Sequence, residues 1–177
     1  MTLTPRVRLR TALSRREPDR LPFDLGSTQV TSISAVAQAR LRARLGLPSV
    51  VARPSDRVQQ LDQVEPDLLQ RLEVDTRGLW PLTTRNGPVE ETDDGTHRSH
   101  EDEWGLTYRI PREGAPWYDL AASPLAGGSL TRERIDAHRW PRGDDPRLVA
   151  GLREEALAHR AAGHAVVLKS LSAGLFE

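Results

Sequence analysis

Apolar residues recur at helical spacing over much of the chain, and short apolar runs that favour strands lie between them. Thr4 followed by Pro5 is typical of a helix start, and Pro18 ends that helix. From Ile33, apolar residues four apart predict a second helix, which ends at Gly46. Further helices are predicted after Asp56 with an interruption at Pro66, over residues 131–138, and from Asp145 to Gly163.

Three stretches have the composition of strands that could lie in a parallel sheet, namely residues 21–25, 74–80 and 165–168. The last is a continuous apolar run after a helix, which is typical of a parallel strand buried on both faces. Alternating helices and strands predict an α/β protein. Because three strands make a poor closed sheet with an open edge, we expect residues 1–177 to form one domain that begins a longer chain.

Residues 81–120 have a different pattern. Apolar residues from Trp104 to Ile110 alternate with polar residues and glycine, and Asp93, Asp94 and Gly95 supply a turn upstream. This pattern predicts an antiparallel hairpin or small meander inserted between the helical parts.

The composition excludes several classes of protein. The chain has 25 Lys and Arg against 25 Asp and Glu, so it lacks the excess positive charge that selects nucleic acid or anionic lipid. It has no cysteine, which excludes disulfides and thiolate chemistry within these residues. No apolar run approaches the about twenty residues that cross a bilayer, and no secretion signal follows the first arginines. We therefore expect a soluble, cytoplasmic protein that binds neither nucleic acid nor a membrane.

The known short motifs for catalysis and nucleotide binding are missing. His97 and His100 precede three carboxylates, but their spacing does not place both rings on one helical face, so we expect a solvated loop and no metal site. Neither the Gly-x-Gly-x-x-Gly nor the Gly-x-x-x-x-Gly-Lys-Ser/Thr pattern occurs, and Gly-x-Ser-x-Gly is also missing. The Gly-rich stretch 125–129 is expected to be a plain connector.

Polar residues at the ends of the predicted parallel strands carry the more interesting chemistry. Asp24 ends the first strand, Arg77 and Trp80 belong to the second, and Lys169 and Ser170 follow the third. The carboxyl ends of parallel strands converge on one rim, where ligands bind. An aspartate there can orient a substrate or accept a proton, and a basic side chain can hold a carboxylate. The alternative is a structural Asp24 that caps its own loop and basic side chains in surface ion pairs.

A series of stretches, taken in order, resembles one known family. They are Pro5–Leu13, Glu17–Gly26, Leu72–Gly78, Asp102–Gly105, Tyr118–Asp119, Ser123–Ala126 and Ser170–Glu177. Together they are similar to the uroporphyrinogen decarboxylase superfamily, which also contains corrinoid-dependent methyltransferases. The resemblance implies a (β/α)8 TIM-type barrel about twice as long as this chain. It makes the chain an incomplete N-terminal half with a β-hairpin insertion at about 81–120.

The resemblance favours the methyltransferase branch. Decarboxylases carry an Arg-Gln-Ala-Gly-Arg loop after the first strand, whose arginines bind porphyrinogen carboxylates, whereas residues 24–32 contain no arginine. Their acidic residue after the second strand has no clear match at residues 79–82. Methyltransferases of the family bind zinc through His and Cys residues in the C-terminal half, and those ligands would lie beyond Glu177.

The sequence therefore predicts a corrinoid (methylcobamide)-linked methyltransferase or demethylase component acting on a small molecule or a corrinoid protein. The residues expected to face the ligand are Asp24, Gly26, Arg77, Trp80 and Lys169. No cofactor is expected within this chain, and zinc and a corrinoid are expected for the full-length protein. The alternatives are a uroporphyrinogen decarboxylase of porphyrin biosynthesis and a non-catalytic, truncated or partner-completed module.

Overall fold

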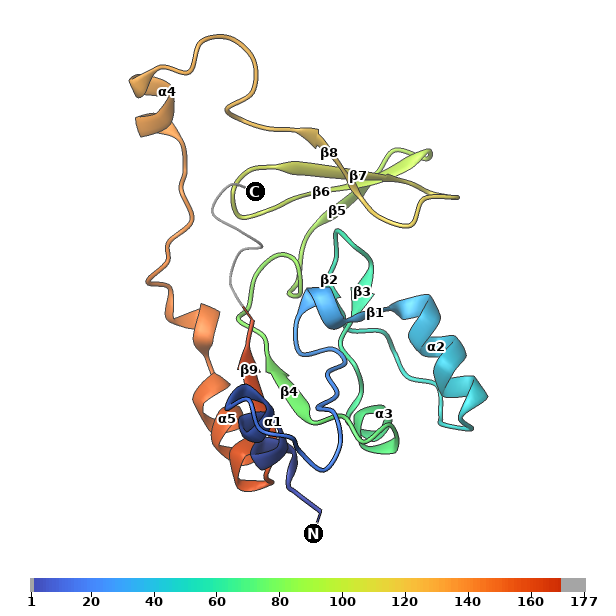
Figure 1. Ribbon diagram of the computed structural model, residues 1–177. Coiled ribbons are helices and arrows are strands. Elements are labelled where there is room, and N and C mark those ends of the chain that lie inside the picture. Colours follow the sequence, from blue (N-terminus) through green and yellow to red (C-terminus); the bar gives the residue numbers. More distant parts are fainter. Residues whose placement is uncertain (1, 170–177) are drawn as a thin grey trace.

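The computed structural model describes residues 2–169, which form three small sheets with helices beside them (Figure 1). None of the helices in these residues is long and apolar enough to cross a bilayer. In chain order the elements are α1 (Pro5–Leu13), the 3-10 helix η1 (Gln29–Thr31), β1 (Ile33–Ser34), α2 (Ala35–Arg44), β2 (Pro54–Asp56), β3 (Leu61–Asp62), α3 (Pro66–Arg71), β4 (Thr76–Leu79), β5 (Glu91–Asp93), β6 (His97–Glu101), β7 (Thr107–Pro111), β8 (Asp119–Ala122), α4 (Arg132–Ala137), the 3-10 helix η2 (Pro146–Val149), α5 (Leu152–Ala161) and β9 (Ala165–Leu168).

The first two predicted helices form, and α1 ends at Leu13, before the stop predicted at Pro18. The Thr4 hydroxyl accepts a hydrogen bond from the Val7 amide at 3.4 Å, and Pro5 takes the first helical position of α1. Helix α2 begins later than predicted because Ser34 caps it by accepting from the Ala37 amide at 3.2 Å. Gly46, with φ +69°, follows its last turn in the left-handed conformation that glycine favours.

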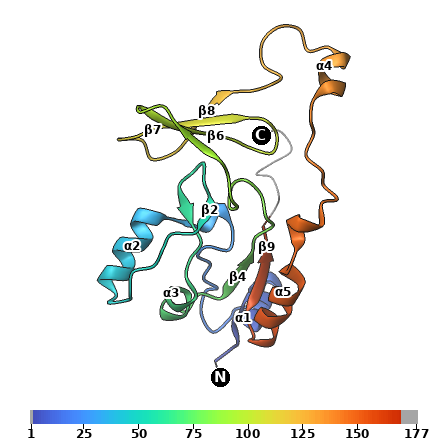
Figure 2. The same ribbon diagram turned by 180° about the vertical axis from the view of Figure 1, so that it is seen from behind.

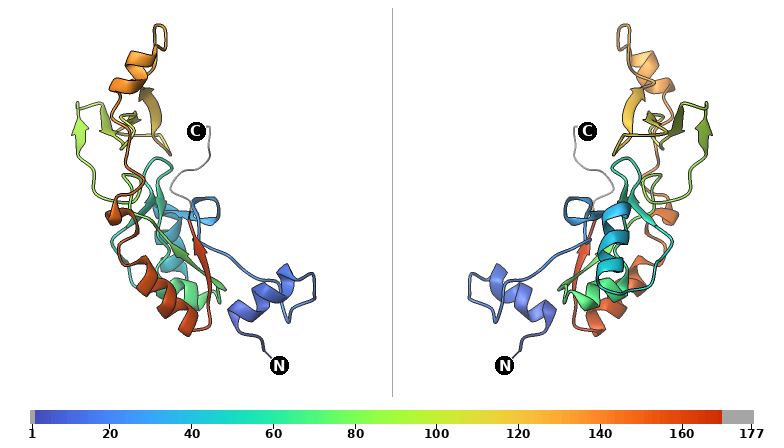
Figure 3. Two further views of the ribbon diagram at one scale, coloured as in Figure 1. Left: turned by 90° about the vertical axis from the view of Figure 1, so that its left-hand side faces the viewer. Right: turned by 90° about the vertical axis from the view of Figure 1, so that its right-hand side faces the viewer.

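Strands β4 and β9 form the parallel pair that the apolar runs predict. Thr76 lies opposite Ala165 and Leu79 opposite Leu168. In the side view, β9 lies between α5 and α1, which cover its two faces (Figure 3). The pair is less buried than predicted, because the Leu168 side chain is 63% exposed. The parallel register brings the carboxyl ends of both strands to one edge.

The predicted antiparallel meander is confirmed, since β5, β6, β7 and β8 pair in that order. Its buried face carries a small core of Tyr108, Ile110 and Tyr118. The meander lies beyond the carboxyl ends of β4 and β9, as the view from behind shows (Figure 2). It therefore borders the rim at which the predicted ligand residues were expected.

The prediction of a (β/α)8 barrel half is wrong. The described residues form two antiparallel sheets and one parallel pair, so they contain no run of parallel strands that could curve into a barrel. The expected first strand, residues 21–25, is irregular: Pro22 has no amide hydrogen, and Leu21 is 85% exposed. This stretch gives β4 only local contacts near Asp75, including the bond from the Asp75 amide to the Phe23 carbonyl at 2.9 Å.

The helix predicted from Asp56 onward does not form in the residues before Pro66. Residues 54–62 instead form the hairpin of β2 and β3, and Gln60 adopts a positive φ of 55° in its turn. Val58, Leu61 and Val64 have helical spacing, but this turn prevents a helix from forming there. Helix α3 begins at Pro66, as the interrupted pattern indicates.

A buried carboxylate connects the N-terminal segment to the parallel pair. Asp75, which is fully buried, forms an ion pair with Arg8 and accepts from Arg20 Nη1 at 2.8 Å and from the Phe23 amide at 2.8 Å. Its own backbone carbonyl accepts from the Ala165 amide at 3.1 Å. One residue therefore joins α1, the segment before residue 24, β4 and β9.

Replacing Asp75 with asparagine should lower the free energy of unfolding by about 3 kcal/mol, because it removes the buried negative charge that Arg8 and Arg20 share and leaves Arg8 with Asp19 alone. Urea denaturation followed by circular dichroism measures the change. Asp144→Asn is the matched control, since Asp144 pairs with Arg142 on the surface and its loss should leave stability unchanged. Equal stability of the two variants would contradict the role assigned to Asp75.

Candidate functional site

Trp80 and Lys169 directly follow the last residues of β4 and β9, and they lie side by side. The register places Leu79 opposite Leu168, and the Lys169 amide donates to the Leu79 carbonyl at 2.9 Å, which extends the ladder by one step. The Lys169 ammonium nitrogen lies 5.8 Å from the centroid of the Trp80 ring, within the range of a cation–π contact. The strand ends thus join two residues that the sequence assigned to the ligand.

The Lys169 side chain is held away from water, with 3% of its surface exposed. Burial lowers its pKa because the charged ammonium loses hydration, and the positive charge of Arg85 acts in the same direction. The carboxylates of Asp56 and Glu103 oppose that change. An anionic group close to Lys169 would stabilise its poorly hydrated ammonium.

Asp56 and Arg85 form the second part of this site. Asp56, at the end of β2, is fully buried, and its Oδ2 lies 3.2 Å from Arg85 Nη1. The other arm of the guanidinium, Nη2, donates to the Tyr108 hydroxyl at 3.4 Å. Glu103 is held differently, since it accepts from both the amide and the hydroxyl of Thr84. These contacts connect β2 and the meander to the end of β4.

Asp24 lies in the loop next to Trp80. Its Oδ1 accepts from the Thr76 hydroxyl, and its Oδ2 accepts from the Ser27 hydroxyl at 2.7 Å. Ser27 and the Trp80 indole both approach Gly78 closely: a Cβ there would lie 2.7 Å from the Ser27 carbonyl oxygen and 2.8 Å from Trp80 Nε1. A side chain at position 78 would separate the Asp24 loop from the indole, so glycine is needed there.

Gly26 and Arg77 lie apart from this group. Gly26 has φ +77°, and a Cβ on it would lie 2.4 Å from a methyl carbon of Val64, so its role in the loop is conformational. The Arg77 guanidinium folds back toward the amino end of β4, where it donates to the carbonyls of Val74 at 3.0 Å and Thr76 at 2.6 Å. Burial lowers its pKa. Of the five predicted residues, the structure therefore brings together Trp80 and Lys169, while Asp24 bonds Thr76 at the amino end of β4.

Sequence reasoning missed Asp56, Arg85 and Glu103. Asp56 has the signal of a helix N-cap, but its partner Arg85 lies 29 residues further along the chain. Nothing local in the sequence indicates that pairing. Only the fold of the β2–β3 hairpin against the segment after β4 brings the two charges together.

The histidine-containing stretch lies on β6 and not in the solvated loop that we predicted. His100 is buried, with its ring centroid 4.8 Å from that of Tyr118 and 5.6 Å from that of Tyr108. Burial lowers its pKa. His97 and His100 are three residues apart in a strand and therefore project from opposite faces. Within residues 2–169 no group of three His, Asp or Glu side chains is placed to hold a metal ion.

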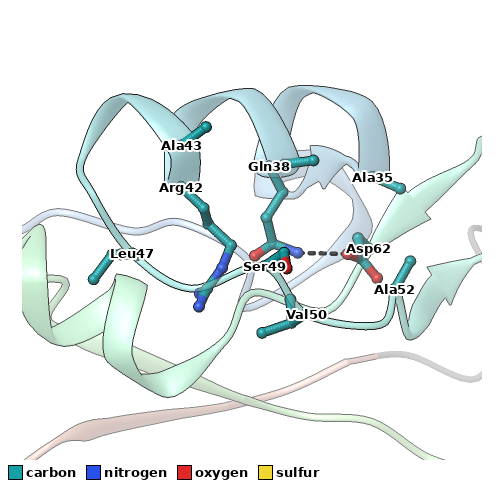
Figure 4. Close-up of a pocket in the computed structure, with 10 residues that line it drawn as sticks. Ala35, Gln38, Arg42, Ala43, Leu47, Ser49, Val50, Ala52 and Asp62 are labelled. Carbon is teal, nitrogen blue, oxygen red and sulfur yellow. Dashed lines mark hydrogen bonds between the residues drawn. The ribbon is translucent and has the colours of Figure 1, made fainter.

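A pocket of about 140 Å³ beside α2 is lined by polar groups that serve the fold (Figure 4). Gln38 donates to the Asp62 carboxylate, and its side-chain oxygen accepts from the Glu65 amide at 3.2 Å. Arg42 is bidentate with Asp67 and also donates to the Pro48 carbonyl. Because these donors and acceptors are already paired, the pocket offers a ligand little beyond apolar contact.

Comparison with known proteins gives no relative on which to base an assignment: no protein family model, no curated protein and no solved structure matches this chain.

The Tyr118 hydroxyl should ionise at unusually high pH. Burial and its bond to Glu91 raise its pKa to about 12, because the phenolate would lose hydration and lie beside a carboxylate. The chain has two tyrosines, so in the Tyr108→Phe variant an ultraviolet titration reports Tyr118 alone. Ionisation near the ordinary value of 10.0 would contradict the buried contact with Glu91.

Proposed function

We propose that this chain serves corrinoid-linked methyl transfer in the cytoplasm, as a methyltransferase or demethylase component, and that its rim site holds an anionic group of the substrate. The site consists of Trp80, Lys169, Asp56 and Arg85, and the loop that carries Asp24 lies along β4. The observation that carries the proposal is the meeting of a buried ammonium and an indole at the carboxyl ends of two parallel strands.

An anionic substrate group suits this site because Lys169 is poorly hydrated. A carboxylate that approaches the ammonium would replace lost hydration with a charge-assisted hydrogen bond. The Trp80 ring offers an apolar surface beside the charge, against which a short carbon chain can pack. Asp56 keeps Arg85 in place, so the second cation of the site is already positioned.

The choice of methyl transfer over decarboxylation is supported by the loop at Asp24. Porphyrinogens carry many carboxylates and need several guanidinium groups to hold them, whereas this loop offers the Asp24 carboxylate, which accepts from the hydroxyls of Ser27 and of Thr76 on β4. A negative charge at that position would repel a polycarboxylate. The ordered series of stretches that resembles the methyltransferase-like members supports the same choice.

Zinc enters this proposal only through the resemblance, which implies an ion that activates a thiolate and places its His and Cys ligands outside residues 2–169. No step through a metal of this chain is therefore derived, and the corrinoid enters the proposal as a substrate.

The test is anaerobic incubation of the protein with methylcobalamin and a thiol. In methyl transfer, the thiolate sulfur bonds the methyl carbon, the cobalt–carbon bond breaks, and both of its electrons remain on cobalt, which is reduced from Co(III) to Co(I). The cobalt spectrum follows this change. We expect a lower KM, by about tenfold, for 3-mercaptopropionate than for the neutral 3-mercapto-1-propanol, because only the former has a carboxylate for Lys169.

The Lys169→Met variant should lose this preference for the anionic thiol, and Arg147→Gln, which changes an exposed ion pair with Asp145, should keep it. Absence of Co(I) formation above the protein-free rate would overturn the proposal. Loss of carboxylates from uroporphyrinogen would instead establish the decarboxylase, and activity in neither assay would leave a binding module.

A further inference from the structure

Residues 119–151 form an extended strap that contains no buried residue. The strap begins with β8, continues through α4 and η2, and ends at the N-cap of α5. It runs along the outside of the molecule from the meander to α5 (Figures 1 and 2). Five of its large apolar side chains each have more than a third of their surface exposed, namely Leu120, Leu130, Ile135, Trp140 and Val149.

Local hydrogen bonds hold the shape of the strap in place of an apolar core. Arg134 Nη1 donates to two backbone carbonyls within the strap, at 2.8 and 2.9 Å. Contacts with the body include the bond from the Leu82 amide to the Leu148 carbonyl at 2.9 Å, and Trp104 meets Trp140 edge to face. Ordering a segment costs conformational entropy, which buried apolar surface normally offsets. Exposed apolar side chains on such a segment therefore indicate a surface that a partner covers.

The total surface of the protein is too large for a compact monomer. The accessible surface is 12073 Å², whereas a folded monomer of 19.7 kDa should expose about 8,600 Å². The nine residues outside 2–169 account for at most about 1,400 Å² of the difference, so about 2,000 Å² of extra surface belongs to the described residues. Obligate homodimers bury about 1,000–2,500 Å² on each protomer. The extra surface therefore matches the area of one such interface.

The charges of the strap favour a second copy of the same chain as the partner. The strap has five arginines and five Asp or Glu residues, and several of them pair within it, as Arg142 does with Asp144. In a two-fold symmetric interface a patch meets its own copy, so a patch with net charge would repel itself. A balanced patch avoids this repulsion, and it gives a strongly charged partner no net attraction.

Strand β8 gives the strap an open edge. It is the last strand of the meander and pairs with β7 only, and each of its residues is exposed. Among residues 2–169 no strand lies on its other side. An open strand edge is a template for pairing with another chain, and two identical edges can pair antiparallel across a two-fold axis.

We propose that the strap binds the strap of a second copy in a two-fold symmetric homodimer. The two β8 edges pair antiparallel, and the exposed apolar side chains of each strap pack against the other copy. The strap includes none of the residues of the rim site, so this proposal does not depend on the proposed function.

Sedimentation equilibrium measures the mass in solution, and we expect about twice 19.7 kDa. Leu120→Arg should weaken dimerisation by at least about tenfold, because it brings two like charges together at the β8 edges. Leu21→Arg is the matched control, since Leu21 is also exposed but lies outside the strap, and this variant should remain a dimer. Circular dichroism checks that both variants fold. The mass of a single chain at every concentration of the unchanged protein would overturn the proposal.

Disulfide trapping locates the interface without a disruptive substitution. Because the chain has no cysteine, a single introduced cysteine reports on one position. The edge is scanned with Asp119→Cys, Leu120→Cys, Ala121→Cys and Ala122→Cys. Under mild oxidation the positions nearest the two-fold axis should give a covalent dimer on a non-reducing gel, and the control Leu21→Cys should not. A dimer that gives no covalent product at residues 119–122 and keeps its affinity in Leu120→Arg uses another surface, which would also overturn the proposal.

Discussion

The buried Asp75 carboxylate is the interaction on which the arrangement of the rim depends. Arg8 reaches it from α1, and Arg20 and the Phe23 amide reach it from the segment before Asp24. Burial of a carboxylate costs free energy unless its oxygens are fully paired. Helix α1, the segment before Asp24 and the segment that carries Asp75 can therefore adopt few other arrangements while Asp75 stays buried. The bond from the Ala165 amide to the Asp75 carbonyl adds β9 to the same point.

Polar contacts of this kind are unusually important in this chain. In residues 2–169 the buried polar and charged side chains outnumber the buried hydrophobic ones, eleven to nine. The apolar core around Leu68 is small, and α2, which packs Leu41 against it, is also held by Gln38 and the Arg42–Asp67 pair. Because hydrogen bonds are directional, such contacts specify position more sharply than apolar packing of similar size does.

The sequence predicted the local features of the fold and missed those that depend on distant residues. Caps such as Thr4 and the apolar run of β9 act within a few residues, and both predictions were confirmed. The barrel that the family resemblance implied is wrong, because the described residues form two antiparallel sheets and one parallel pair. Residues 21–25, expected as its first strand, are held by the Asp75 side chain without a ladder. The helix predicted after Asp56 was also wrong: that stretch forms a hairpin, and Asp56 pairs with Arg85.

The candidate site shows the same division. Trp80 and Lys169 could be predicted together because parallel strands bring their carboxyl ends to one edge, whatever the rest of the fold is. Arg77 was grouped with them by position in the chain, but its guanidinium bonds the carbonyls of its own segment. Strand position therefore determines which edge a residue occupies, and the competing hydrogen bonds determine whether its side chain reaches a ligand there.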